Sequence, residues 1–538
     1  MFRRITASIA GLLFVGNIYA AGIDETIDKA VKPASDFIEK YVFYPIPLPG
    51  DNAMPLVLCF LIFAAVYCTI YFGFPNIRYF KHAISTLRGK YKNIESIKHP
   101  IYTSSLVNIV DEDIVDTIRD ESVQGEVSHF QALSSALSGT IGLGNIAGVA
   151  IAIAIGGPGA TVWMIISGFL GMSSKFTECT LGTKYRDIGP DGTVYGGPMY
   201  YLSKGLAEKG YKTIGKILAV VFAIFCVGGS LGGGNMFQSN QSAAIVKDIF
   251  KLDSGNTGFF IGIFLAILTG VVIIGGIKRI GSVAEKIVPF MCGIYIIAGL
   301  VVIGLNYSYV PAAFGAIFEG ALSAQSIAGG VIGVLIAGFR RAAFSNEAGV
   351  GSAAIAHSAV RTRYPASEGI VALLEPFIDT IIVCTMTALI IVISNTNHHF
   401  LEYGSGTGLN GVALTSAAFE TTLPGFSYIL ALAVFLFAFS TMISWSYYGL
   451  QAWLYLFGRT KSNELTYKVI FLIFVVIGGS IQLNSVIGIS DSMILAMVFP
   501  NLIGLLVLSP VVKEEVSRYL AAIKMLLGGK SDGQPNRT

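Results

Sequence analysis

Long apolar runs alternate with short polar stretches along most of this 538-residue chain. A helix that crosses the hydrocarbon core of a bilayer needs about 20 mostly apolar residues, and the runs predict about eleven such spans. They cover residues 54–73, 131–156, 160–181, 214–245, 257–276, 285–305, 325–346, 367–394, 425–457, 465–484 and 489–511. The pattern therefore predicts an all-α membrane protein, with the lipid bilayer as its surroundings.

The composition agrees with that prediction. Hydrophobic residues make up 53% of the chain and charged residues only 13%, whereas a soluble protein carries about a quarter charged residues. The net charge of +3 gives no field that would favour a nucleic-acid partner. The six cysteines form no CxxC pair, so we expect them to be small buried side chains. Nothing in the sequence indicates an oligomeric state.

The N-terminus has the pattern of a signal peptide, predicted over residues 1–21. Arg3 and Arg4 precede an apolar stretch, and Ala20 and Ala21 offer small residues for cleavage. A retained membrane anchor is the alternative. Basic residues gather in alternate loops, which marks those loops as cytoplasmic. We therefore predict a multi-pass protein of a bacterial inner membrane with a periplasmic N-terminus and a cytoplasmic C-terminus.

One predicted span is interrupted by a cluster of glycines, Ser138-Gly139-Thr140-Ile141-Gly142-Leu143-Gly144-Asn145-Ile146-Ala147-Gly148. Glycine is a poor helix former, so several together at membrane depth allow the backbone to unwind. Freed carbonyls can then bind a cation, and freed N–H groups can bind a carboxylate. The side-chain amide of Asn145 adds a further oxygen ligand. The alternative is that the glycines only let helices pack closely.

A second candidate break spans Gly338 to Gly349, five spans after the first. An odd repeat of five inverts the second half of the protein relative to the first, and corresponding breaks point to a site at the interface of the halves. We predict a five-plus-five inverted repeat with one extra N-terminal helix. Its parts are a periplasmic segment 22–53, the extra helix 54–77, a cytoplasmic loop 78–129, repeats 130–305 and 325–512, an external loop 306–324 and a cytoplasmic tail 513–538.

Other polar residues lie within the apolar runs. Gln238 could meet a bound ammonium or carboxylate group, or simply form an interhelical hydrogen bond. Ser440 and Thr441 could offer hydroxyl oxygens to Na⁺, which prefers hard donors, or could bond back to their own helix. Trp445 is large enough to bound a small pocket.

Four ionisable residues in the runs have competing interpretations. Lys175 and Glu178 are three apart, so we expect them to pair across one helical turn. Asp379 is a candidate coupling residue, or a structural partner for a cytoplasmic arginine. We expect His357 to be a satisfied buried histidine rather than a proton relay.

Several motifs, taken together, resemble the alanine or glycine:cation symporter family of the amino acid–polyamine–organocation type superfamily. They run in order from about Phe74 to Phe457 and include Gly142–Gly148, Gly156-Gly157-Pro158-Gly159-Ala160, Gly196-Gly197-Pro198-Met199-Tyr200-Tyr201, Phe344-Ser345-Asn346-Glu347-Ala348-Gly349, Phe377–Thr387 and Trp445-Ser446-Tyr447-Tyr448-Gly449. The resemblance implies a five-plus-five fold and sodium-coupled uptake of alanine or glycine. It implies no cofactor besides Na⁺ as the coupling ion.

The stretch Gly142-Leu143-Gly144-Asn145 is also similar to the unwound first core helix of sodium-coupled neurotransmitter-type symporters. That similarity implies a Na⁺ held by the carbonyls of Gly139 and Ile141 and the hydroxyls of Ser440 and Thr441. The substrate would contact a set that surrounds its carboxylate, ammonium and side chain: Thr140, Gly142, Gly144, Asn145, Gln238, Phe339, Phe344 and Trp445. Leu143 departs from the smaller or polar residue that the family often carries there.

Three other functions compete with this one: proton-coupled amino acid transport, a membrane-embedded enzyme, and a passive channel, which would show currents far above carrier rates. Proton-coupled amino acid transport would run through Asp379 or Glu178. A membrane-embedded enzyme would need catalytic groups converging at one depth, and no HExxH motif or paired midplane carboxylates occur in the sequence. We therefore predict a transporter and no enzyme.

Overall fold

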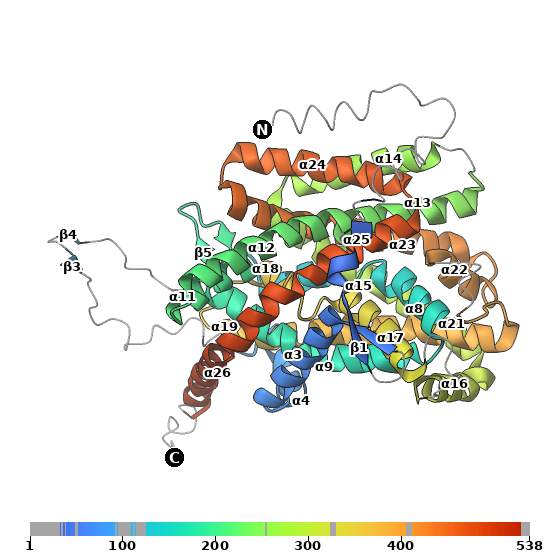
Figure 1. Ribbon diagram of the computed structural model, residues 1–538, viewed down its shortest axis with the longest axis horizontal. Coiled ribbons are helices and arrows are strands. Elements are labelled where there is room, and N and C mark those ends of the chain that lie inside the picture. The colour runs from blue at the N-terminus through green and yellow to red at the C-terminus, as the bar shows by residue number, and fades with distance from the viewer. Residues whose placement is uncertain are drawn as a thin grey trace, which may run out of the picture.

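The computed structural model describes residues 39–48, 52–91, 125–252, 256–322, 330–404 and 411–528, with a few isolated positions between 33 and 114. The predicted signal peptide 1–21 lies outside these residues, as does most of the 92–124 stretch. The described chain is dominated by helices (Figure 1). Its strands form three short antiparallel pairs: β1 (Pro45–Leu48) with β2 (Asn52–Pro55), β3 (Ile109–Val110) with β4 (Asp113–Ile114), and β5 (Asp187–Ile188) with β6 (Val194–Tyr195).

The helices of the first half follow the predicted spans closely. They are α3 (Leu56–Tyr71), α4 (Pro75–Arg78), α5 (Phe80–Leu87), α7 (His129–Thr140), the π-helical η2 (Gly144–Gly148), α8 (Val149–Gly156), α9 (Ala160–Lys184), α10 (Pro198–Tyr200), η3 (Tyr201–Gly205), α11 (Leu206–Glu208), α12 (Lys212–Leu231), η4 (Gly232–Met236), α13 (Phe237–Phe250), α14 (Thr257–Ile273) and α15 (Gly276–Leu305).

The second half continues with a similar series. It comprises η5 (Tyr307–Tyr309), α16 (Val310–Leu322), α17 (Gly330–Asn346), α18 (Ala353–His357), α19 (Pro365–Ala372), α20 (Leu374–Pro376), η6 (Phe377–Cys384), α21 (Thr385–His398), α22 (Val412–Glu420), α23 (Phe426–Phe457), α24 (Lys461–Ser480), α25 (Leu483–Ala496) and α26 (Val498–Gly528).

Within the described residues, six helical segments are long and apolar enough to cross a membrane, and the bent pair α7 with η2–α8 makes a seventh. Two shorter apolar helices, α3 and α14, join them. This confirms the predicted all-α, multi-pass membrane protein.

The predicted span at 160–181 forms α9, which is not among those apolar segments. Its second half carries polar side chains that are essentially inaccessible to solvent, namely Ser173, Ser174, Lys175, Thr177, Glu178 and Thr180. Helices α3, α17, α19 and α26 pack around it. A helix surrounded by protein can bond its polar groups to neighbours instead of exposing them to lipid. Helix α9 is therefore central to the molecule.

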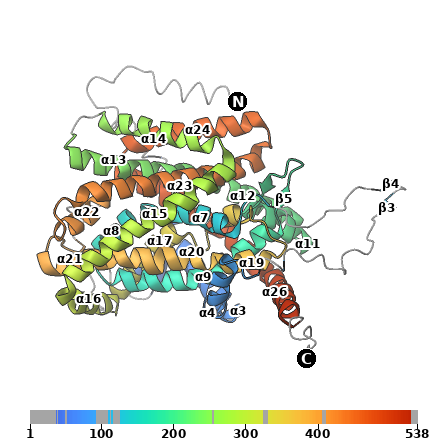
Figure 2. The ribbon, with the colours of Figure 1, turned by 180° about the vertical axis from the view of Figure 1, so that it is seen from behind.

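Other helices form the edges and the ends of the molecule. Helices α14 and α24 pack together along one edge of the molecule in both views (Figures 1 and 2). The extra helix α3 lies against α9 and α26 near the opposite edge. Helices α16 and α22 lie at one end of the molecule, and the C-terminal part of α26 extends from the other end.

The stretch 306–324, which we expected to be an external loop, is largely helical. It forms η5 and α16, and α16 packs against α9 and α21. Ala313, Ile317 and Ala321 are the buried residues of α16. Their spacing of four places them on one helical face, so a short amphipathic helix covers this end of the bundle.

Helices α14 and α24 approach closely because glycines line their contact. A Cβ atom at Gly262 would lie 2.8 Å from the Cα atom and 2.9 Å from the carbonyl oxygen of Val476 on α24. Gly258, one turn earlier, lies against Gly479 in the same way. Small residues four apart allow membrane helices to pack backbone to backbone.

We predict that Gly262→Ala lowers the thermal unfolding midpoint of the detergent-purified protein. Forcing a methyl group into a packed interface costs about 1–3 kcal/mol. The matched control is Gly293→Ala on α15, where a Cβ atom meets nothing within 4 Å and the better helix propensity of alanine leaves stability unchanged or slightly higher. Equal midpoints for Gly262→Ala and the wild type would contradict the close contact.

Candidate functional site

The predicted break in the first core helix is present. Helix α7 ends at Thr140, η2 begins at Gly144, and the two halves meet at an angle of 50°. The N–H of Gly142 donates to Asn145 Oδ1 (2.9 Å), and the N–H of Leu143 donates to Gln238 Oε1 (3.1 Å). In a continuous helix the N–H of Leu143 would donate to the carbonyl of Gly139, four residues earlier. Because that N–H bonds to Gln238 instead, the carbonyl of Gly139 loses its regular donor.

The carbonyl of Ile141 is released in the same manner. Its regular donor would be the N–H of Asn145, which bonds to the Gly142 carbonyl instead (3.2 Å). The two carbonyls that we expected to hold a cation thus lack their helical donors. The freed N–H groups of Gly142 and Leu143 donate to side-chain oxygens of Asn145 and Gln238. The amide oxygen of Asn145, which we expected to be a further ligand, therefore already accepts a hydrogen bond from the turn that contains it.

Gly142 allows this turn to touch α23. A Cβ atom at Gly142 would overlap the hydroxyl oxygen of Thr441 and would lie 3.2 Å from Gln238 Oε1. Gly144 is less constrained, because a Cβ atom there would lie 3.4 Å from Ser345 Cα, an ordinary contact. The absence of a side chain at Gly142 therefore sets the distance between the break and α23.

The second break is shifted from its predicted position. We expected it to span 338–349, but α17 remains helical to Asn346 and the chain unwinds only over 347–352. Glu347, Gly349 and Gly351 have φ angles of +54°, +87° and +94°. Gly338 serves packing instead, since a Cβ atom there would lie 2.7 Å from Trp163 Cβ on α9.

Side-chain amides satisfy the backbone groups at this second break. Asn346 Oδ1 accepts the N–H of Ala348 (2.9 Å), and Asn501 Nδ2 donates to the Gly349 carbonyl (2.9 Å). Asn501 also donates to Glu178 Oε1 (2.8 Å). Unwound backbone at membrane depth is tolerated only where such partners are present.

Asp379, on η6, lies between the two breaks. Its carboxylate accepts hydrogen bonds from Asn145 Nδ2 (2.5 Å), Ser345 Oγ (3.0 Å) and Thr380 Oγ1 (2.7 Å). Asp379 is fully buried, and no Lys, Arg or His of the described residues forms an ion pair with it. Among the described residues it is therefore not the partner of a cytoplasmic arginine, and its hydrogen bonds connect it to Asn145 at the first break and to Ser345 on α17.

A small cavity of about 10 Å³ lies beside the first break, roughly the space that one water molecule needs. Its lining includes seven of the expected residues, together with Gly233, Glu347 and Ile494; the seven are Gly139, Thr140, Gly144, Gln238, Phe344, Thr441 and Trp445. Phe339 does not line it, and its ring instead lies 6.4 Å from that of Trp163. The lining also lacks four other expected residues, namely Ile141, Gly142, Asn145 and Ser440.

Glu347 is the charged residue of this cavity lining, and it is not among the predicted site residues. Its Oε1 atom accepts a hydrogen bond from Trp445 Nε1 (2.9 Å), and its other oxygen accepts one from Ser352. An acidic residue within Ser345-Asn346-Glu347-Ala348-Gly349, inside an apolar run, was the available signal. Trp445 also packs against Gly234, where any Cβ atom would overlap its ring.

The two hydroxyl residues of α23 differ in their bonding. Thr441 Oγ1 is buried and has no hydrogen-bond partner among the described residues. Ser440 Oγ donates to the Phe437 carbonyl (2.9 Å), the back-bonded geometry that was the alternative interpretation. The oxygen of Thr441 therefore has its lone pairs available beside Gly142.

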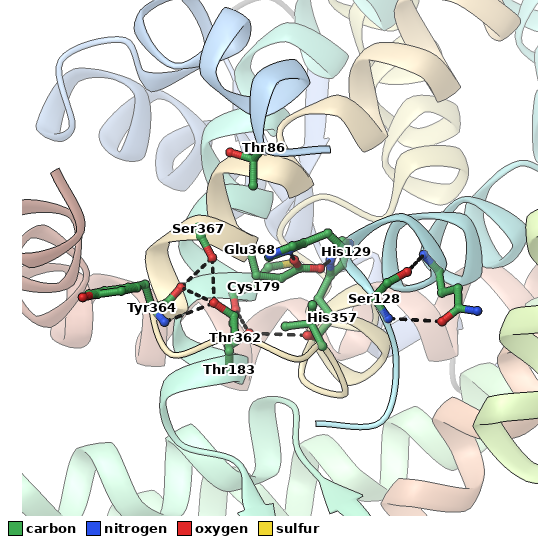
Figure 3. A network of polar contacts seen from close by, with 12 residues as sticks. Thr86, Ser128, His129, Cys179, Thr183, His357, Thr362, Tyr364, Ser367 and Glu368 are labelled. Carbon is green, nitrogen blue, oxygen red and sulfur yellow. Dashed lines mark hydrogen bonds and ion pairs between the residues drawn. The ribbon is translucent and has the colours of Figure 1, made fainter. Parts of the chain in front are cut away.

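A network of buried ionisable residues lies next to the site, and part of it is shown in Figure 3. Lys175 pairs with Glu375 (3.0 Å) on α20 and not, as we expected, with Glu178. His357 lies between Glu368 (2.6 Å) and Glu375 (3.4 Å), and His129 at the start of α7 contacts Glu368. Buried charged side chains that have lost their hydration need oppositely charged or hydrogen-bonding partners. This network therefore holds α7, α9, α18, α19 and α20 together.

The chain is similar to several known proteins. The sequence profile of the Sodium:alanine symporter family matches residues 50–530. The "Sodium/alanine symporter AgcS" of Methanococcus maripaludis is 40% identical over 86% of this chain and 94% of that protein. The "Amino-acid carrier protein AlsT" of Bacillus subtilis is 33% identical over 90% of both chains. The crystal structure of MhsT in complex with L-phenylalanine superposes with a TM-score of 0.48 and 15% identity, over 73% of this chain and 99% of that one.

We predict that Gly142→Ala reduces initial uptake of the transported solute at least tenfold, because the new methyl group displaces Thr441 or the turn itself. The matched control is Gly148→Ala in η2, where the nearest atom, Arg341 Cδ, lies 3.9 Å from the added Cβ. Both variants are compared at equal amounts of protein in the membrane. Wild-type uptake by Gly142→Ala would show that the close approach to α23 is dispensable.

Proposed function

The chain belongs to the sodium:alanine symporter family, and on that premise we propose that it couples inward Na⁺ movement to uptake of a small neutral amino acid, alanine or glycine. One observation carries the proposal. The unwound turn of the first core helix, with two released carbonyls, lies against an unpartnered buried hydroxyl at the edge of a small cavity. Hard oxygen donors of this kind suit an alkali cation.

The cavity has two ends that suit an amino acid zwitterion. Glu347 provides a carboxylate for the ammonium group. The turn 142–145 provides backbone N–H groups for the carboxylate, with the substrate taking the place of Gln238 Oε1 at the N–H of Leu143. Gln238 can then turn its amide N–H toward the substrate.

The apolar part of the lining limits the substrate's side chain. Phe344, Trp445 and Ile494 bound the cavity, and all three are buried. A methyl group or a hydrogen atom fits such a space with the least rearrangement, which favours alanine and glycine. Thr140 completes the wall beside the break.

For Na⁺, we propose the carbonyls of Gly139 and Ile141 and the hydroxyls of Thr441 and Ser440 as ligands. The ion would hold the unwound turn in one conformation and so raise substrate affinity, and by linkage the substrate would raise Na⁺ affinity by the same factor. Exposing this site first to the outer and then to the inner side of the membrane would carry Na⁺ and the amino acid across together. The protein would lie in a bacterial inner membrane with its C-terminus in the cytoplasm, in accord with the basic loops.

Purified protein in liposomes should accumulate labelled alanine when a Na⁺ gradient is imposed, and should not when only a pH gradient is imposed.

Thr441→Val should raise the Na⁺ concentration for half-maximal uptake at least tenfold, since losing an ion ligand that is worth about 1.4 kcal/mol changes affinity tenfold. Valine keeps the shape of threonine and removes only the hydroxyl.

The matched control for Thr441→Val is Thr396→Val on α21, where the hydroxyl bonds back to the Val392 carbonyl (2.8 Å). We expect wild-type Na⁺ dependence from that variant. Alanine uptake that proceeds equally without Na⁺ would overturn sodium coupling. Unlabelled amino acids, added in competition, would identify the preferred substrate.

Proton coupling is the second candidate function, and Asp379 is the observation that favours it. A buried carboxylate without a basic partner must be neutralised by a bound cation or by a proton. Asp379 meets this description among the described residues. Its contact with Asn145 would link protonation directly to the first break.

We predict that Asp379→Asn reduces Na⁺-driven alanine uptake at least tenfold, because the site loses the negative charge that favours a cation next to the break. Asparagine keeps the size of the side chain. If uptake by the wild type followed a pH gradient and did not respond to a Na⁺ gradient, and if Asp379→Asn abolished that uptake, proton coupling through Asp379 would replace sodium coupling as the mechanism.

A further inference from the structure

Two arginines and one aspartate form a largely buried cluster that the proposed ion site does not include. Arg340 Nε on α17 lies 2.9 Å from Asp491 Oδ2 on α25, and Arg341 Nη2 contacts the same oxygen. Arg341 is 6% exposed and Asp491 is fully buried. Two guanidinium groups facing one buried carboxylate leave an excess of one positive charge. In addition, Arg341 Nη1 has no hydrogen-bond partner among the described residues.

The cluster borders a cavity of about 340 Å³, which lies within the range of small-molecule sites. Apart from the two arginines its lining is apolar and comes from α8, α17 and the residue Ala53: it comprises Ile151, Ala152, Ile155, Ile332, Gly333, Ile336 and Ala337. The Arg341 guanidinium lies 5.6 Å from the ring centre of Phe344, which lines the small cavity beside the first break. Arg341 therefore lines the larger cavity and lies next to a residue of the small one.

Part of the N-terminal segment covers this cluster. Glu39 Oε1 lies 3.6 Å from Arg340 Nη2, and the ring centre of Phe43 lies 4.1 Å from the Arg340 guanidinium carbon. Ala53 of β2 contributes to the cavity lining. Glu39 is 43% exposed, and its distance from Arg340 is too long for a hydrogen bond. An ion pair that is so exposed contributes little stability, so another carboxylate could replace Glu39.

We propose that Arg340 and Arg341 form an outer binding site for the carboxylate of the amino acid, and that Glu39 is an internal carboxylate that competes for it. The inference rests on the proposed function, because it adds a second binding site for the same substrate on the outer side of the small cavity beside the first break. Once Glu39 is displaced, the excess positive charge of the two arginines holds the substrate carboxylate, and the apolar lining accepts a small side chain. Binding there displaces Glu39 and brings the substrate next to Phe344.

Removing the competing carboxylate should strengthen substrate capture. Glu39→Gln should lower the KM for alanine about threefold to tenfold at an unchanged maximal rate in the liposome assay, a change of about 0.7–1.4 kcal/mol. The matched control, Glu319→Gln on α16, removes an exposed carboxylate elsewhere on the proposed outer face and should leave KM unchanged. Arg340→Gln should raise KM and abolish the effect of Glu39→Gln in the double variant. An unchanged KM in Glu39→Gln would overturn the proposal.

A labelling experiment tests the site without transport. Ile336→Cys, in the cavity lining, is reacted with a membrane-impermeant sulfonate thiol reagent in Na⁺-free medium, with the wild type as background for its six free cysteines. Alanine should slow the reaction, alaninamide, which lacks the carboxylate, should not, and Glu39→Gln should speed it. Equal protection by alanine and alaninamide, or none by either, would refute the outer site.

The two assays separate this inference from the proposed function. Normal Na⁺-driven uptake without carboxylate-specific protection would leave the symport proposal intact and remove only the outer site. Protection by alanine without any Na⁺-driven uptake would retain a carboxylate site and remove the symport proposal.

Discussion

The structure depends on one constraint: backbone N–H and C=O groups inside a membrane must find partners within the protein. Two helices of this chain are interrupted at depth, and each interruption exposes groups that a continuous helix would satisfy. Asn145 and Gln238 accept hydrogen bonds from the freed N–H groups of the first break. At the second break, Asn346 accepts the N–H of Ala348 and Asn501 donates to the carbonyl of Gly349. The released carbonyls at the first break are the groups that a cation could bind.

A second constraint follows from burying charge. Asp379 connects the first break to η6, Glu347 connects the second break to Trp445 on α23, and the Lys175–Glu375 pair with its histidines connects α9 to the helices after the second break. Each contact joins segments far apart in sequence. A change of charge at any of them, by ion binding or protonation, would alter the relative stability of the two breaks together, which is what coupling requires.

The sequence predicted much of this architecture, because apolar runs and glycine clusters are local signals. The run lengths indicated the spans, and Ser138–Gly148 indicated a break that the structure places at residues 141–143. The same reasoning misplaced the second break: Gly338 has no side chain because α9 packs against it, whereas the chain unwinds at Glu347, a residue type that rarely takes positive φ. Short-range preferences could not distinguish these two uses of glycine.

What the sequence determined by itself was the class of the protein, its family resemblance and the first broken helix, since hydropathy and glycine content act along a single segment. The tertiary structure decided which charges meet. Lys175 could pair with Glu178 one turn away, yet it meets Glu375 on another helix. Likewise Asp379 meets Asn145, and Glu39 lies over Arg340. The energies of such pairs depend on distance and burial in three dimensions, and neither can be obtained from spacing along the chain.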